Sequence, residues 1–109
     1  MLYRQGDILI RRIDKIPLRR RRVDEGETQR IVLAYGEITG HAHVIEARPD
    51  EARIRHGVVE REERTFLEVL APSVRLEHDE HAVIEIPAGE YEIVRQREYT
   101  GERPQRVAD

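Results

Sequence analysis

Apolar and polar residues alternate with a period of two along most of this chain. In "GDILIRRI" Ile8 and Ile10 share one face, and in "TQRIVLAYG" Ile31, Leu33 and Tyr35 do the same. A period of two is typical of a β-strand that buries one face. The pattern therefore predicts strands in the first third of the chain.

The same alternation continues to residue 99, with turn signals between the segments. "GHAHVIEA", "ARIRHGVV", "SVRLEH" and "HAVIEI" each read as a strand, and a long final strand begins at Tyr91. "EREERTFLEVL" also has a composition that favours a helix. There Phe66 and Glu68 alternate with Leu67, and Pro72 ends the run, so we expect a strand.

About seven short strands without a convincing long helix predict an all-β fold, either a small antiparallel barrel or a sandwich. The chain of 109 residues is expected to form a single β domain over residues 1–100. Residues 101–109, "GERPQRVAD", contain few apolar side chains and are expected to form a loosely ordered C-terminal tail.

Composition narrows the possible chemistry. Hydrophobic residues make up 39% of the chain and charged residues 38%, and the net charge is −3. The chain has no cysteine, which excludes disulfides, thiolate metal sites and cysteine nucleophiles. No apolar run is long enough to span a membrane, and the N-terminus lacks a signal-peptide pattern, so we expect a cytoplasmic protein.

Two histidine clusters are the strongest functional signal. His41 and His43 alternate in "GHAH", so in a strand they lie on the same face, as a pair of metal ligands requires. His78 and His81 lie in "EHDEH" at a predicted turn. If folding brings the clusters together, the four imidazoles could hold one divalent ion, Zn, Fe, Mn or Ni. Ordinary solvated or structural histidines are the alternative interpretation.

A metal site of this kind could support hydrolysis of a small-molecule or phosphate-containing substrate. The ion would acidify a bound water, and Glu77, Asp79 or Glu80 could serve as the general base. A site closed by four histidines would be structural instead. Because neutral imidazole is the ligand form, metal affinity should fall below the unperturbed pKa of about 6.5.

Two non-catalytic functions are also open. The four consecutive arginines Arg19, Arg20, Arg21 and Arg22 could follow the phosphate backbone of single-stranded nucleic acid, although neighbouring acidic residues weaken their field. Alternatively, the long terminal strand "IPAGEYEIVRQREY" could pair with a protein partner or with a second copy to form a homodimer.

Two resemblances accompany these signals. "GHAHVIE" is similar to the first cupin motif, in which a glycine, an H-x-H pair and a glutamate provide the metal site of a β-barrel. Gly40, His41, His43 and Glu46 would match, but the spacing departs from that motif, and the second cupin motif is not met. Over nearly its full length, through "TGHAH", "EHDEH" and "PAGEYEIVRQREY", the chain resembles a family of small uncharacterised bacterial and phage proteins.

Overall fold

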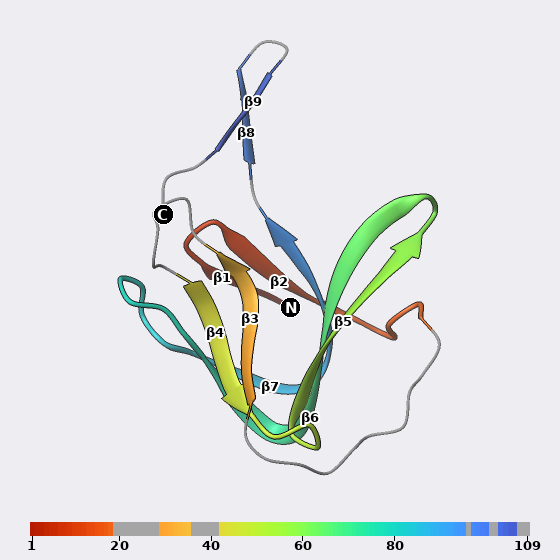
Figure 1. Cartoon of the computed structure of the whole chain (residues 1–109), viewed down its shortest axis with the longest axis vertical. Coiled ribbons are helices and arrows are strands. Elements are labelled where there is room, and N and C mark those ends of the chain that lie inside the picture. The colour runs from red at the N-terminus through yellow and green to blue at the C-terminus, as the bar shows by residue number, and fades with distance from the viewer. Residues whose placement is uncertain (19–28, 36–41, 96, 101–102, 107–109) are drawn as a thin grey trace.

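Most of the described chain is β-strand, and seven strands form one antiparallel sheet (Figure 1). The computed structural model describes residues 1–18, 29–35, 42–95, 97–100 and 103–106. The all-β class is confirmed, and Phe66 lies in a strand as expected. The strands of the sheet are β1 (Leu2–Gln5), β2 (Ile8–Ile13), β3 (Gln29–Tyr35), β4 (Ala42–Ala47), β5 (Ala52–Val59), β6 (Glu62–Glu77) and β7 (Ile84–Arg95).

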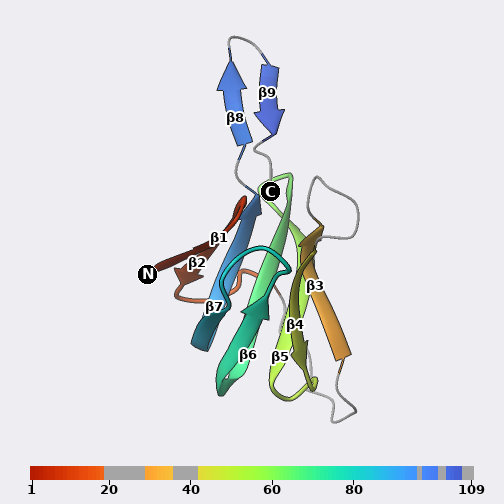
Figure 2. The same cartoon turned by 90° about the vertical axis from the view of Figure 1, so that its left-hand side faces the viewer.

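The sheet is open, which corrects the barrel form of the prediction. Its strand order is β1-β2-β7-β6-β4-β3, with β5 also paired to β6. The long strand β6 pairs with β5 through its first half and with β4 through its last residues. The sheet therefore has two leaves that share β6 and β7: a first leaf with β1, β2 and β5, and a second leaf with β3 and β4 (Figure 2).

A bulge in β6 folds the two leaves toward each other. The pairing of β6 with β7 shifts between Val69 and Ser73. Within this stretch the N–H groups of Leu70 and Ala71 donate to the carbonyl oxygen of Glu51, in the β4–β5 turn, at 2.8 and 3.0 Å. Extra residues in one strand bend it and increase its twist. The result is a sandwich-like arrangement in which β1 and β3 remain at the two ends of the strand order.

The hydrophobic core lies between the leaves. Strands β2, β3, β4, β6 and β7 each contribute at least two buried residues to it, and full burial of one large aliphatic side chain contributes about 1.5–3 kcal/mol. A slip of one residue would turn these side chains to solvent, so the core fixes the register of the strands that contribute to it. Its buried members are Ile8, Ile10, Ile31, Leu33, Ile45, Ala47, Ala52, Leu67, Val69, Val74, Leu76, Ile86 and Tyr91.

The segment after β2 packs on the outer face of the first leaf. Ile16 is buried, and its N–H donates to Glu90 Oε1 at 3.2 Å. The Leu18 side chain lies over Gly57, where a Cβ atom would be only 2.4 Å from Leu18 Cδ2. A glycine at this position of β5 therefore lets the segment approach the sheet closely.

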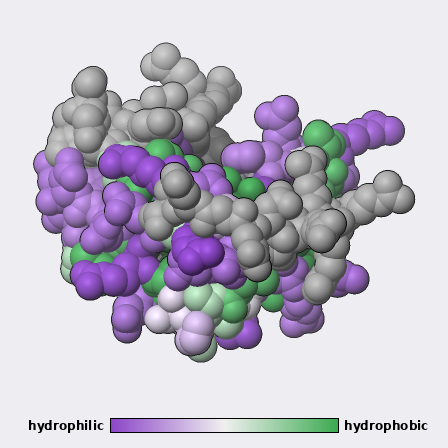
Figure 3. All heavy atoms as spheres, turned by 60° about the horizontal axis from the view of Figure 1, so that its bottom comes forward, coloured by the Kyte–Doolittle hydropathy of each residue, from purple (hydrophilic) through white to green (hydrophobic). Residues whose placement is uncertain are grey.

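The last described residues form a separate hairpin. β8 (Arg97–Thr100) pairs with β9 (Arg103–Arg106) in a two-stranded sheet, so part of the expected tail is a strand. Residues 101–102 and 107–109 lie outside the described part, and the domain boundary near residue 100 stays a prediction. Among the residues coloured in Figure 3, hydrophilic side chains predominate, with apolar patches between them. Among the described residues, no helix has the length and apolar character needed to cross a membrane.

Candidate functional site

Three of the four predicted metal-ligating histidines lie together at one end of the sandwich. The ring centroids of His43 and His78 are 4.4 Å apart, those of His78 and His81 are 4.5 Å apart, and those of His43 and His81 are 6.2 Å apart. Folding therefore brings the "HAH" and "EHDEH" segments side by side, as expected. His41 lies outside the described residues.

The strand pattern explains why His43 is inside. His43 shares its face of β4 with Ile45 and Ala47, which belong to the core, and it is 0% exposed. Ile45 pairs with Leu76 of β6, whose side chain is also buried. His78 follows Leu76 by two residues, so it continues toward the same interior. His43 is thus a core histidine and does not lie on a solvated strand face.

Gln5, at the end of β1, fixes the tautomer of His43. Its Nε2 donates to the carbonyl oxygens of Leu76 and Ala82 at 3.0 and 2.9 Å. The side-chain oxygen of Gln5 must therefore face His43 Nδ1, at 2.9 Å, and accept a hydrogen bond from it. In neutral His43 the proton is then on Nδ1, and Nε2 carries a lone pair.

Asp7 occupies the position opposite that lone pair. Its Oδ1 lies 3.3 Å from His43 Nε2, and its Oδ2 accepts a hydrogen bond from Arg95 Nε at 2.8 Å. Asp7 is 2% exposed. Burial, reinforced by the charge of nearby His78, lowers the pKa of His43 to about 4, although Asp7 acts in the opposite direction. His43 is therefore neutral near pH 7, and two hydrogen-bond acceptors face each other.

His78 and His81 differ in what they present to this pair. The backbone N–H of Glu80 donates to His78 Nδ1 at 3.0 Å, so neutral His78 carries its proton on Nε2. The Nε2 atom of His81 is buried and has no hydrogen-bond partner among the residues that the structure describes. Within those residues, no three His, Asp or Glu side chains are already arranged to hold a metal ion.

Residue Gly6 lies directly beside two of the rings. It is the glycine of a tight turn between β1 and β2, where Gln5 pairs with Ile8, and its φ is 58°. A Cβ atom built on Gly6 would lie 2.7 Å from His81 Nε2 and 3.2 Å from His43 Cε1. The backbone of this turn therefore forms one wall of the histidine cluster.

The carboxylates predicted as general bases lie at the surface. Glu77, Asp79 and Glu80 are all exposed, and Glu77 follows buried Leu76 on the opposite face of β6. The carboxylate beside the histidines is Asp7, which the sequence interpretation missed. The available signal was "GD" between two alternating segments, which is typical of a two-residue hairpin turn.

The predicted nucleic-acid-binding arginines and one further histidine, His56, complete the set of candidate residues. Arg19, Arg20, Arg21 and Arg22 lie outside the described residues, so the expected nucleic-acid surface has no structural description. His56 is exposed on β5, and its Nδ1 is 3.1 Å from Thr65 Oγ1.

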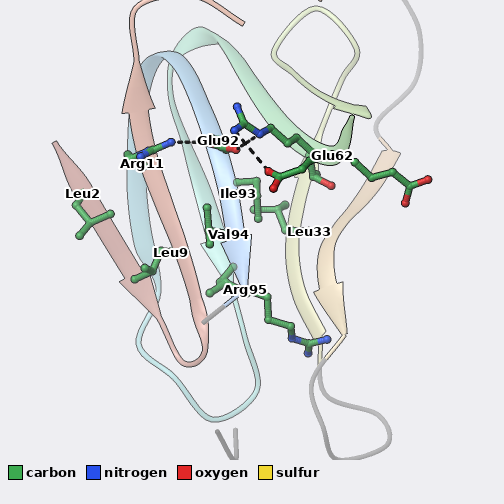
Figure 4. A pocket seen from close by; sticks show the side chains of 13 residues that line it. Leu2, Leu9, Arg11, Leu33, Glu62, Glu92, Ile93, Val94 and Arg95 are labelled. Carbon is green, nitrogen blue, oxygen red and sulfur yellow. Dashed lines mark hydrogen bonds and ion pairs between the residues drawn. The ribbon is translucent and has the colours of Figure 1, made fainter. Parts of the chain in front are cut away.

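A cavity of about 650 Å³ adjoins the cluster through Arg95 (Figure 4). In the figure Leu33 of β3 faces Ile93 and Arg95 of β7 across it. Glu92 is paired with Arg11, and its Oε2 lies 3.5 Å from Arg64 Nε. The lining residues are Leu2, Ile8, Leu9, Arg11, Leu33, Glu62, Glu63, Arg64, Thr65, Glu92, Ile93, Val94 and Arg95.

These features define an all-β domain with a buried cluster of histidines, a carboxylate and a glutamine at one end. The chain belongs to the family described as "Domain of unknown function (DUF8820)", whose model matches residues 4–96. This range contains Gln5, Asp7, His43, His78 and His81. The predicted membership of an uncharacterised family is thereby confirmed. No curated protein and no solved structure matches the chain.

Proposed function

We propose that this protein binds one divalent transition-metal ion through His43 Nε2, Asp7 Oδ1 and His81 Nε2. The observation that carries the proposal is the 3.3 Å approach of the Nε2 lone pair of His43 to the Asp7 oxygen. Two facing acceptors in a buried site repel each other, and a cation bound between Nε2 and Oδ1 would relieve that repulsion. A proton is a poor candidate near pH 7, because burial lowers the pKa of His43 to about 4.

The separation of these two atoms suits a metal. With bonds of about 2.0–2.1 Å, neighbouring ligand atoms around a tetrahedral zinc ion lie about 3.3 Å apart. The hydrogen bond from His43 Nδ1 to Gln5 is the outer-shell contact that metal-bound imidazoles usually make, and it keeps Nε2 deprotonated. Histidine and carboxylate ligands suit Zn, Fe, Mn and Ni, the four ions expected from the sequence.

The third ligand in this proposal is His81, because its buried Nε2 needs a partner. The ring must turn toward the Asp7–His43 pair when the ion binds. His78 takes a different role, since its Nδ1 accepts a hydrogen bond and its Nε2 carries the proton. In this proposal the protonated Nε2 of His78 keeps that ring out of the ligand set. Among the described residues the ligand set is thus two histidines and a carboxylate, and His41, outside the described residues, stays a predicted fourth ligand.

The reaction we propose for such a site is metal-assisted hydrolysis. A bound divalent ion would lower the pKa of a coordinated water and polarise a carbonyl or phosphoryl oxygen. Glu77, Asp79 and Glu80 flank His78 at the surface and remain the proposed general bases. The adjoining cavity combines apolar walls with Arg and Glu side chains, which suits a small substrate with both apolar and charged groups.

The other functions and properties expected from the sequence are proposals that rest on the sequence alone. Binding of single-stranded nucleic acid depends on Arg19–Arg22, and the protein partner or homodimer depends on the last strands. The same holds for the cupin-like relationship, the bacterial or phage origin, the family-wide occurrence of "TGHAH" and "EHDEH", and the cytoplasmic location.

Metal analysis of untagged protein tests the proposal. Protein purified without a histidine tag should contain a transition metal, and metal-stripped protein should bind one zinc ion per chain in a titration against a chromophoric chelator. Cobalt should give the intense visible bands of a low-symmetry site. Protein that contains no metal and takes up none at pH 8 would contradict the proposal.

A further inference from the structure

We propose that Gly6 is a positioning residue of the metal site, whose missing side chain leaves the space that His81 Nε2 requires. This inference rests on the proposed function and extends it to a residue that ligates nothing. It follows from two independent observations: the positive φ of Gly6 and the short distances from its virtual Cβ to the two rings.

The positive φ alone would explain a glycine at this turn. A φ of 58° lies in the left-handed region, where a residue with a Cβ atom pays about 1 kcal/mol. Asn and Asp also tolerate this region, so turn geometry by itself does not require the complete absence of a side chain. The short distances from the virtual Cβ of Gly6 to the two rings are what require the absence of a side chain.

The space around Gly6 is already filled by the cluster. An added methyl group would lie 2.7 Å from His81 Nε2 and 3.0 Å from His81 Cδ2, which is shorter than a van der Waals contact. The affected atoms are at the tip of a side chain that can rotate. The fold can therefore accommodate the methyl group by moving the His81 ring, and the displaced ring then loses the position from which it turns toward the Asp7–His43 pair.

The effect of a substitution should therefore fall on metal affinity more than on stability. Gly6→Ala should weaken zinc binding about tenfold or more, the range found when groups that orient metal ligands are removed. In metal-free protein the same substitution should shift the His81 ring resonances in long-range ¹H–¹⁵N spectra. The melting temperature should fall only by the amount that backbone strain explains.

Gly89 offers a matched control. It also has a positive φ, of 154°, and a Cβ there would crowd a movable side-chain tip, the Arg12 guanidinium, at 3.1 Å. Gly89 lies at the bend, where it pairs with Val69 of β6. Gly89→Ala should therefore cost at least as much stability as Gly6→Ala while zinc affinity stays within twofold of the wild type.

Titration of the wild type, Gly6→Ala and Gly89→Ala separates the possible outcomes. The proposal is supported when Gly6→Ala alone weakens zinc binding and moves the His81 resonances. It is overturned when Gly6→Ala binds zinc as tightly as the wild type, or when Gly89→Ala weakens it equally. A wild type without zinc affinity defeats the proposed function. The His81 resonances of the metal-free variants still test whether Gly6 holds that ring in place.

Discussion

Two groups of charged and polar side chains, one on the outer face of the first leaf and one in the interior between the leaves, have different surroundings. On the outer face, Glu92 lies between Arg11 and Arg64, so a buried acceptor is met by donors on two sides. In the interior, His43 Nε2 faces Asp7 Oδ1, and an acceptor is met by an acceptor. Both carboxylates are nearly buried and both pair with an arginine, but only Asp7 also faces a ring nitrogen that carries a lone pair.

We infer from this difference that the inner group is the one that would gain from a bound cation. Buried polar groups in folded proteins are almost always paired, since an unmatched one costs about 1–3 kcal/mol. In the outer group the carboxylate of Glu92 is paired with two arginines of the same sheet, so these residues form a stabilising ion-pair ladder. In the inner group Arg95 pairs with Asp7, while Asp7 Oδ1 also faces His43 Nε2, and this acceptor-to-acceptor contact is the feature on which the proposed metal site rests.

The largest expected effect is the loss of metal binding in His43→Ala. Removing the central ligand should weaken zinc affinity about a thousandfold, equivalent to about 4 kcal/mol. Competition with a chromophoric chelator measures it. His56→Ala removes an exposed histidine that contacts Thr65 and should leave the affinity unchanged. Equal losses in both variants would mean that zinc binds surface histidines without a defined site.

The next effect is a dependence of stability on pH in the metal-free protein. The pKa of His43 is about 4 in the folded state and about 6.5 in the unfolded chain. Between these values the unfolded chain binds a proton that the folded chain does not, so lowering the pH from 6.5 to 4 should cost about 3 kcal/mol. Urea denaturation at several pH values measures this decrease.

The control for that pH dependence is His43→Asn. The asparagine amide can still donate to Gln5 but cannot titrate, so its stability should fall less between pH 6.5 and 4. Titration of carboxylates is common to both proteins and cancels in the difference. Parallel stability curves for the two proteins would show that the neutral state of residue 43 is not maintained by the fold.

A smaller effect distinguishes the two carboxylates directly. Glu92→Gln leaves two arginines against a neutral amide and should destabilise the protein by about 1–3 kcal/mol. Asp7→Asn should cost less in metal-free protein, because its amide N–H can donate to His43 Nε2 while its oxygen still accepts from Arg95. Thermal unfolding compares the two variants. A larger cost for Asp7→Asn would contradict the acceptor-to-acceptor assignment.

The smallest effect is expected at the solvent-exposed end of the ladder. The Arg11 side chain is 58% exposed, and exposed ion pairs contribute about 0–1 kcal/mol. Arg11→Ala should therefore lower the unfolding free energy by less than about 1 kcal/mol and leave zinc affinity unchanged. Measurements at low and high salt should show that most of this small effect is screened. A change in zinc affinity would instead link the ladder to the cluster.

The strands could be predicted because the period of two reports burial directly. Alternation at Ile8, Ile10, Ile31 and Leu33 identifies core faces that the structure confirms. The open form of the sheet could not be predicted from the alternation of apolar residues. It depends on the bulge before Ser73 and on the contacts of Glu51 with β6, which set the direction of two long strands without changing the pattern of apolar residues.

The residues of the histidine cluster were predictable only in part, because some of them are defined by long-range contacts. Spacing identifies His43, His78 and His81 as a group, because two short histidine-rich segments are visible in the sequence. Asp7 and Gln5 carry no such signal, since a single polar residue at a turn or strand end is common. Asp7 and Gln5 belong to the cluster because they contact His43, more than thirty positions away. Local sequence patterns do not predict contacts between residues so far apart.

The hydrogen bond between Asp7 and Arg95 joins residues separated by 88 positions, and the one from Gln5 to Ala82 spans 77. Contacts of such long sequence separation require closure of large loops, so they form late and slow the folding of small β proteins. The cluster is therefore assembled only when both ends of the domain have docked. Occupation of the site by an ion would report complete folding, and truncation at either end would abolish it.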